Sequence, residues 1–160
     1  MKILIIGIGN PGRGDDGLGP ALAARMAGVG AGELAEGAVV EIPGGPSAVW
    51  KYQLNIEDAH LVKDFDVVVF ADASTEGAAP VTLNEIAPAA AIAFTTHEMS
   101  PSAVLALGEE LYGRMPRGYR LAVRGYSWEL REGLSAAAAN NLEDALERFR
   151  RFLLSRAEYS

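Results

Sequence analysis

The sequence predicts an α/β fold in which helices cover both faces of a mostly parallel sheet. Apolar runs alternate with helical patterns along the chain, an order typical of βαβ units. Residues 3–6 are all apolar, as in a strand that is buried on both faces of a parallel sheet. The 160 residues show no linker or repeat, and a chain of this length can bury a core without disulfides. We therefore expect a single domain, residues 1–160.

Short apolar runs bounded by turn residues predict the strands. Five are expected, at residues 3–6, 38–42, 67–70, 81–86 and 119–123. The run at 67–70, Val-Val-Val-Phe, is the most apolar and predicts the most buried strand. Apolar and polar residues alternate at 81–86, which predicts an edge strand.

Helical spacing and capping residues predict the helices. A helix is expected at residues 16–27, with an acidic cap and Pro20 in its first turn, and a broken helix at 47–65. Ser100 followed by Pro101 predicts the start of a helix that runs to residue 112. The clearest helix, 135–156, has an apolar face formed by Ala138, Leu142, Ala145, Phe149 and Phe152.

Composition excludes several classes of function. The net charge of −7 argues against nucleic acid as a partner, because such binding depends on clustered Lys and Arg. The absence of cysteine excludes disulfides, thiolate metal sites and a cysteine nucleophile. No apolar run approaches the ~20 residues of a membrane span, and no signal-peptide pattern precedes the first strand. We expect a cytoplasmic protein without a membrane partner.

A glycine-rich loop at residues 7–20 directly follows the first strand and leads into a helix. This layout usually binds phosphate through free backbone N–H groups. Here the loop carries Asp15 and Asp16, whose carboxylates repel an anion and attract a cation. The loop therefore predicts a metal site.

Three candidate metal ligands follow predicted strands or precede a predicted helix. Asp16 follows the first strand, Asp72 lies just beyond Phe70, and His97 lies before the Ser100–Pro101 helix start. Ligands of open α/β sheets gather at the carboxyl ends of the strands. Two carboxylates and an imidazole suit nickel, zinc or cadmium, and three protein ligands leave positions open for water or substrate.

Each of these residues also has a purely structural interpretation. Asp15 or Asp16 can cap the first helix, although one cap leaves the other aspartate unexplained. Asp72 can form an Asx-turn, and His97 can bond to a carbonyl group or lie in solvent. His60 has no comparable placement, and we do not expect it to be functional.

Two other chemistries fit the sequence poorly. Residues 7–12 match the dinucleotide-binding pattern G-x-G-x-x-G, with Glu41 as the acidic residue after the second strand, but Pro11 and the acidic pair disfavour a pyrophosphate. Residues 125–129 resemble a nucleophile elbow but end in Glu129 where glycine is required.

The motifs at residues 7–10, 14–19, 70–72 and 96–97 together resemble those of the hydrogenase maturation endopeptidases. The resemblance runs from residue 1 to about residue 154. It implies a three-layer α/β/α fold of the phosphorylase/hydrolase type with a five-stranded twisted sheet. It also implies that Asp16, Asp72 and His97 are the metal ligands and carry the activity.

The resemblance implies a function as well. Members of this family remove a C-terminal peptide from the large-subunit precursor of a nickel–iron hydrogenase after nickel insertion, and the nickel is thought to belong to the substrate. Zinc or cadmium are expected surrogates, and we expect a monomer. Two alternatives stay open: a nickel-dependent chaperone that binds the precursor without cutting it, and a peptidyl-tRNA hydrolase, which shares the opening Gly-x-Gly-Asn-Pro-Gly.

Overall fold

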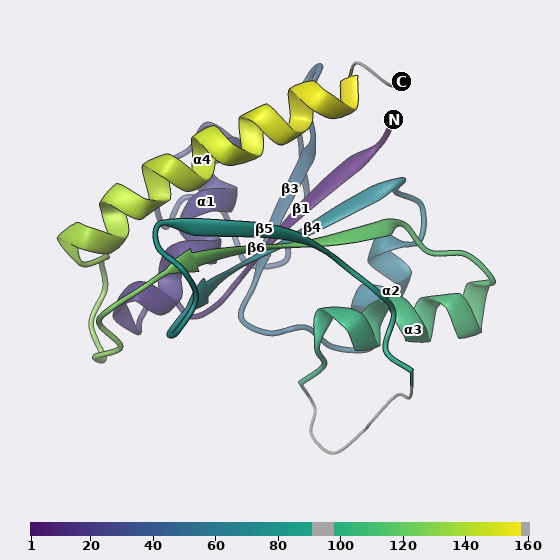
Figure 1. Ribbon diagram of the computed structural model, residues 1–160, viewed down its shortest axis with the longest axis horizontal. Coiled ribbons are helices and arrows are strands. Elements are labelled where there is room, and N and C mark those ends of the chain that lie inside the picture. The colour runs from purple at the N-terminus through teal and green to yellow at the C-terminus, as the bar shows by residue number, and fades with distance from the viewer. Residues whose placement is uncertain (91–97, 158–160) are drawn as a thin grey trace.

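The computed structural model describes residues 1–90 and 98–157. Within them, six strands form one sheet in the order β2-β3-β1-β4-β6-β5 (Figure 1). The strands are β1 (Ile3–Ile8), β2 (Val40–Glu41), β3 (Ser47–Lys51), β4 (Val67–Ser74), β5 (Val81–Ile86) and β6 (Arg117–Arg124). The four inner strands are parallel, while β2 and β5 pair antiparallel to their neighbours at the two edges.

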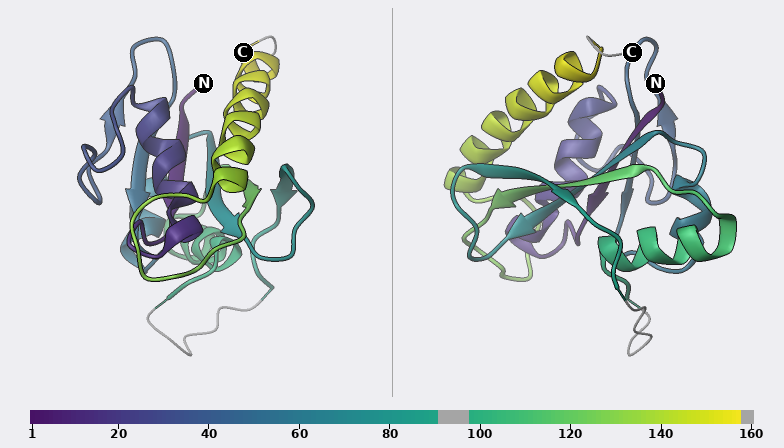
Figure 2. Two further views of the ribbon diagram at one scale, coloured as in Figure 1. Left: turned by 90° about the vertical axis from the view of Figure 1, so that its left-hand side faces the viewer. Right: turned by 45° about the vertical axis from the view of Figure 1, so that its right-hand side comes forward.

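Helices cover both faces of the sheet, as predicted. They are α1 (Leu18–Met26), α2 (Glu57–Val62), α3 (Pro101–Tyr112) and α4 (Ala136–Ala157), and a 3₁₀ turn, η1 (Gly14–Gly17), precedes α1. Helices α1 and α4 lie on one face and α2 and α3 on the other (Figures 1 and 2). The predicted three-layer α/β/α architecture is therefore confirmed.

The alternation of side chains along the inner strands builds one hydrophobic core on each face. In β1, Ile5 packs with α1 and α4, whereas Leu4 and Ile6 pack with α2 and α3. All three are fully buried. The continuous apolar run that predicted this strand thus reflects burial on both faces.

The prediction of five strands was one strand short. The segment expected as a broken helix at 47–65 begins with β3, which pairs in parallel with β1, and becomes helical only in α2. The sequence Ser-Ala-Val-Trp-Lys is too short for its period to distinguish a strand from a helix. The pairing with β1 decides its conformation.

The ends of the other elements agree with their local signals to different degrees. Helix α3 has the predicted bounds, and the Ser100 side chain accepts a hydrogen bond from the Ala103 N–H at 3.1 Å. Strand β5 lies at the edge of the sheet as predicted, but β2 has only two of the five residues expected for it. None of the helices in residues 1–90 and 98–157 has the length and apolar character needed to cross a membrane.

The sheet has a topological switch point between its two central strands. The chain leaves β1 through α1 toward β3, whereas it leaves β4 toward β5 and β6 on the opposite side. Loops therefore diverge at the carboxyl ends of β1 and β4, where open α/β sheets bind ligands.

Candidate functional site

Glycines bring the start of α1 into direct contact with the ends of the central strands. A Cβ atom at Gly7 would clash with the carbonyl oxygen of Gly19, and one at Gly19 would lie 2.5 Å from the carbonyl oxygen of Ala71 in β4. Gly9 has φ +144°, a backbone conformation that other residues rarely adopt. The glycine motif is thus required for packing, and it holds Asp16 beside the carboxyl end of β1.

The Asp16 carboxylate is fixed by the backbone of the same loop. Its Oδ2 accepts a hydrogen bond from the Asn10 N–H at 2.8 Å. Its Oδ1 has no hydrogen-bond partner within the described part of the chain. The expected acidic cap of the first helix was wrong, because η1 and α1 have no side-chain cap and the residue before α1 is Gly17.

Asp72 lies inside β4, one position beyond the last residue that pairs with β1. Both of its carboxylate oxygens accept hydrogen bonds from the Arg120 guanidinium, Oδ1 from Nε at 3.1 Å and Oδ2 from Nη2 at 3.3 Å. The Asx-turn interpretation was therefore wrong: the side chain bonds across the sheet to β6. The sequence carried no signal for this pair, because it depends on the register between β4 and β6.

The charge of Asp16 acts on the Asp72 carboxyl. Burial raises the pKa of the Asp72 carboxyl, the Arg120 guanidinium opposes this through its charge and hydrogen bonds, and the Asp16 carboxylate raises the pKa further. Two neighbouring carboxylates repel each other, and a bound cation relieves this repulsion. Together with the close approach of Gly19 to Ala71, the residue before Asp72, this effect places Asp16 and Asp72 as a pair at the switch point.

A cavity of about 310 Å³ opens beside Asp72. Its lining includes Ile8 of β1, Leu54, and residues 98–101 at the start of α3. Glu98, the residue that follows His97 in the sequence, is therefore in this lining. His97 itself lies outside the described residues.

The metal site as a whole stays a prediction. Among residues 1–90 and 98–157, no group of three or more His, Asp or Glu side chains is placed to hold a metal ion. The structure brings two of the three predicted ligands together, and the third is not described. The donors present are two carboxylates, and one oxygen of Asp16 has no partner among the residues that the structure describes. These donors fit a divalent cation.

Asp15 has a structural role whose partners the sequence did not indicate. It is completely buried, and its carboxylate accepts hydrogen bonds from the N–H groups of Tyr126, Ser127 and Ser135 at 2.7–2.9 Å and from the Ser135 hydroxyl at 2.7 Å. The Ser135 hydroxyl in turn accepts a hydrogen bond from the Ala138 N–H in the first turn of α4. The hydrogen bonds of Asp15 therefore link the β6–α4 loop to the loop that carries Asp16.

These hydrogen bonds determine the ionisation of Asp15. Burial opposes the charged form, but the four hydrogen bonds together outweigh burial and lower the pKa of the carboxyl. The unexplained member of the Asp15–Asp16 pair was the only sequence signal of this role. Its partners lie more than 100 residues away in the sequence, beyond any local pattern.

The structure places the other candidates away from this site. His60 is exposed on α2, where its ring contacts Tyr112 of α3. Glu41 lies on the antiparallel edge strand β2. The next strand along the chain that pairs in parallel with β1 is β3, which ends in Lys51. The end of β3 therefore lacks the acidic residue that a dinucleotide site requires.

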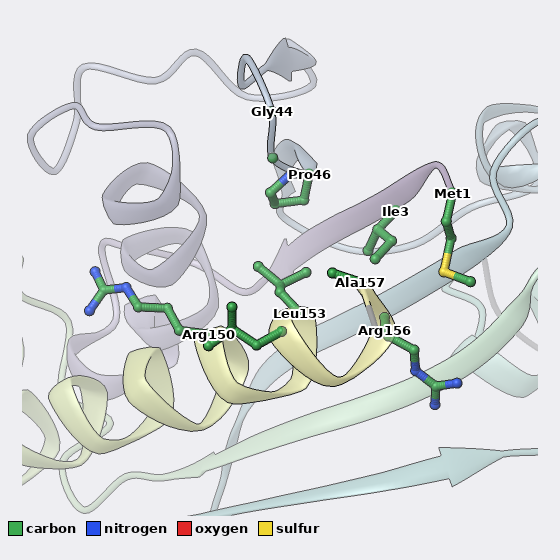
Figure 3. A pocket seen from close by; sticks show the side chains of 10 residues that line it. Met1, Ile3, Gly44, Pro46, Arg150, Leu153, Arg156 and Ala157 are labelled. Carbon is green, nitrogen blue, oxygen red and sulfur yellow. The ribbon is translucent and has the colours of Figure 1, made fainter. Parts of the chain in front are cut away.

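A second cavity, of about 660 Å³, lies at the opposite end of β1. It is lined by Met1 and Ile3, by the β2–β3 turn and by the last turns of α4. Figure 3 shows Ile3, Pro46 and Leu153 around this cavity, while the guanidinium groups of Arg150 and Arg156 point away from it. Its lining contains no carboxylate, so it lacks the groups that the predicted metal chemistry requires.

We expect a divalent cation to stabilise the folded protein. A cation that binds only the folded state at ten times its Kd adds about 1.4 kcal/mol, which raises Tm by about 3–6 °C for a chain of this size. Thermal unfolding with millimolar nickel, zinc or cadmium measures this shift, and Asp72→Asn is the control that should lose it. A Tm that none of the three metals changes would contradict a cation site.

Comparisons with known proteins support the predicted resemblance. No protein-family model matches the sequence, and no curated protein matches it. Among solved structures, it resembles the hydrogenase maturating endopeptidase HybD from Escherichia coli, with a TM-score of 0.67, 21% identity, and coverage of 98% of this chain and 94% of HybD. The [NiFe] hydrogenase maturation protease HycI from Thermococcus kodakarensis has a TM-score of 0.63 and 24% identity, with 95% of this chain and 92% of HycI covered.

A third structure gives the same result. The hydrogenase 2 maturation peptidase from a Thaumarchaeota archaeon has a TM-score of 0.62 and 17% identity, and the match covers 96% of this chain and 98% of that protein. In each of the three comparisons, the match spans nearly the whole length of both proteins. The chain therefore has the fold of the hydrogenase maturation endopeptidases.

Proposed function

We propose that this protein is an endopeptidase that removes the C-terminal tail of a nickel–iron hydrogenase large-subunit precursor after nickel insertion. The observation that carries the proposal is the meeting of Asp16 and Asp72 at the switch point between β1 and β4. The Asp16 charge acts on Asp72, and both lie where this sheet topology binds ligands. The fold shared with HybD and HycI supports the same function.

In this proposal Asp16, Asp72 and His97 recognise the nickel that the precursor carries. His97 is assigned to the site because the next residue, Glu98, lines the cavity beside Asp72. An imidazole nitrogen adds the borderline donor that favours nickel over calcium or magnesium. Zinc and cadmium have similar ligand preferences and serve as surrogates.

Recognition through the nickel of the substrate couples cleavage to metal insertion. A precursor without nickel lacks the group that the three side chains bind, so its tail stays in place. A divalent ion held beside the scissile bond would also polarise a carbonyl group or lower the pKa of a bound water. Cleavage of the tail would then occur only after nickel has been inserted into the precursor.

Incubation with the precursor tests the proposed function directly. We expect the nickel-loaded precursor to lose the mass of its C-terminal tail, as measured by mass spectrometry, while the nickel-free precursor keeps it. Asp72→Asn is the matched inactive control. A stable complex without mass loss would replace the protease by the nickel-dependent chaperone, and cleavage without nickel would contradict nickel recognition.

Three further expectations remain predictions: the cytoplasmic location, the monomeric state and the organisation as one domain. The peptidyl-tRNA hydrolase alternative is disfavoured by the net charge of −7, which repels an RNA backbone. Hydrolysis of peptidyl-tRNA by the purified chain would reinstate it.

A further inference from the structure

The Asp72 carboxylate forms an ion pair with the Arg120 guanidinium. Strands β4 and β6 are neighbours, and in their register Arg120 lies opposite Phe70, while Ala122 lies opposite Asp72. The side chain of Arg120 therefore reaches diagonally from β6 to Asp72 on β4. Its Nε and Nη2 atoms each donate to a different oxygen of the carboxylate. This forked arrangement is the strongest geometry available to an arginine and a carboxylate.

The surroundings of this pair distinguish it from an ordinary surface ion pair. Arg117, three residues earlier in β6, makes a similar fork with Glu85, but both side chains are largely exposed, at 61% and 47%. The Asp72 side chain is only 28% exposed and lies in the field of Asp16. Arg120 therefore neutralises a partly buried carboxylate that would otherwise repel its neighbour.

The fork opposes the binding of a metal ion at Asp72, because it uses one lone pair of each carboxylate oxygen and adds a positive charge beside the site. A divalent cation bound to a carboxylate oxygen lies within ~2.5 Å of it, so the guanidinium on the same carboxylate would lie within a few ångströms of a second positive centre. Arg120 has room to withdraw, because its side chain is 45% exposed. The Arg120 guanidinium therefore lowers the affinity of Asp72 for a metal ion through charge repulsion, and a bound metal favours the withdrawn arginine.

We propose that Arg120 is a specificity-determining residue that competes with the metal for Asp72. This inference rests on the proposed function, because it assumes that Asp72 binds the nickel of the precursor. The fork lowers the affinity for any free divalent ion. Nickel held in the precursor is bound despite this cost, since contacts with the rest of the precursor contribute to binding. Arg120 therefore helps the site to select loaded precursor over free metal.

Metal affinity of the free protein tests the competition without reference to cleavage. Isothermal titration with nickel chloride and with cadmium chloride should show about 10-fold tighter binding for Arg120→Leu than for the wild type. Arg120→Gln should show a similar gain, and Arg120→Lys, which keeps the charge, should stay near the wild type. Arg117→Leu is the matched control, and its affinity should not change.

The outcomes separate this inference from the proposed function. An affinity of Arg120→Leu and Arg120→Gln that is equal to or lower than that of the wild type overturns the competition and leaves the metal site standing. A merely structural role of Arg120 predicts a loss of affinity, so a gain identifies the competition. If neither the wild type nor the variants bind metal, recognition of nickel by Asp72 fails, and the competition fails with it. The double variant Arg120→Leu with Asp72→Asn should lose the gain.

Discussion

Replacement of His97 by alanine is expected to abolish processing of the nickel-loaded precursor while the fold persists. The substitution removes the only nitrogen donor of the proposed site and leaves two carboxylates, which select poorly for nickel. Loss of an outer-shell partner alone typically costs about 10- to 100-fold in metal affinity or activity, so we expect the rate to fall by more than about 100-fold. Cleavage followed by mass spectrometry measures the rate, and circular dichroism checks the fold.

Two further variants serve as comparisons for His97→Ala. Asp72→Asn keeps the shape of the side chain and removes its charge, so it should lose processing to a similar extent. His60→Ala should process normally, because His60 contacts Tyr112 and does not line the cavity beside Asp72. Wild-type cleavage by His97→Ala would remove His97 from the site. Unfolding of this variant would instead identify His97 as a structural residue.

Replacement of Asp15 by asparagine is expected to destabilise the protein by about 3 kcal/mol at neutral pH. The carboxylate accepts four hydrogen bonds in a fully buried position, and an asparagine amide would present N–H donors to some of the same donors. Urea denaturation measures the change in the free energy of unfolding. Asp144→Asn on the exposed face of α4 is the control and should change it by less than about 0.5 kcal/mol.

The contribution of Asp15 should depend on pH in a defined direction. Its pKa is lowered in the folded state, so the stabilisation is fully present above the unfolded value of about 3.9 and is lost as the pH falls through the folded value. The difference between wild type and Asp15→Asn should therefore shrink below about pH 4. A difference that stays constant from neutral pH to pH 2, or an Asp15→Asn protein as stable as the wild type, would contradict this role.

The fold could be predicted from the sequence wherever a signal lies within a few neighbouring residues. Ser100 and Pro101 predict the start of α3 because an N-cap and a first-turn proline act on the same helical turn. The all-apolar run at the start of β1 predicts burial on both faces for a similar reason. The glycines and the aspartate pair predicted a ligand-binding loop, because both signals lie in the few residues that directly follow the first strand.

Tertiary structure alone decided the features that depend on strand pairing. The segment at 47–51 becomes β3 because β1 offers it a parallel partner, and its own five residues fit a helix as well. The Arg120–Asp72 fork joins residues 48 positions apart and exists only in the register of β4 with β6.

The same division applies to the two aspartates of the glycine loop. The sequence predicted that one of them faces a ligand, but it could not predict which partner the other would have. Asp15 binds Ser135 across 120 positions, because the β6–α4 loop returns to the start of α1. A carboxylate that loses its water on burial must find donors, and the folded chain, rather than the neighbouring residues, brings these donors to it.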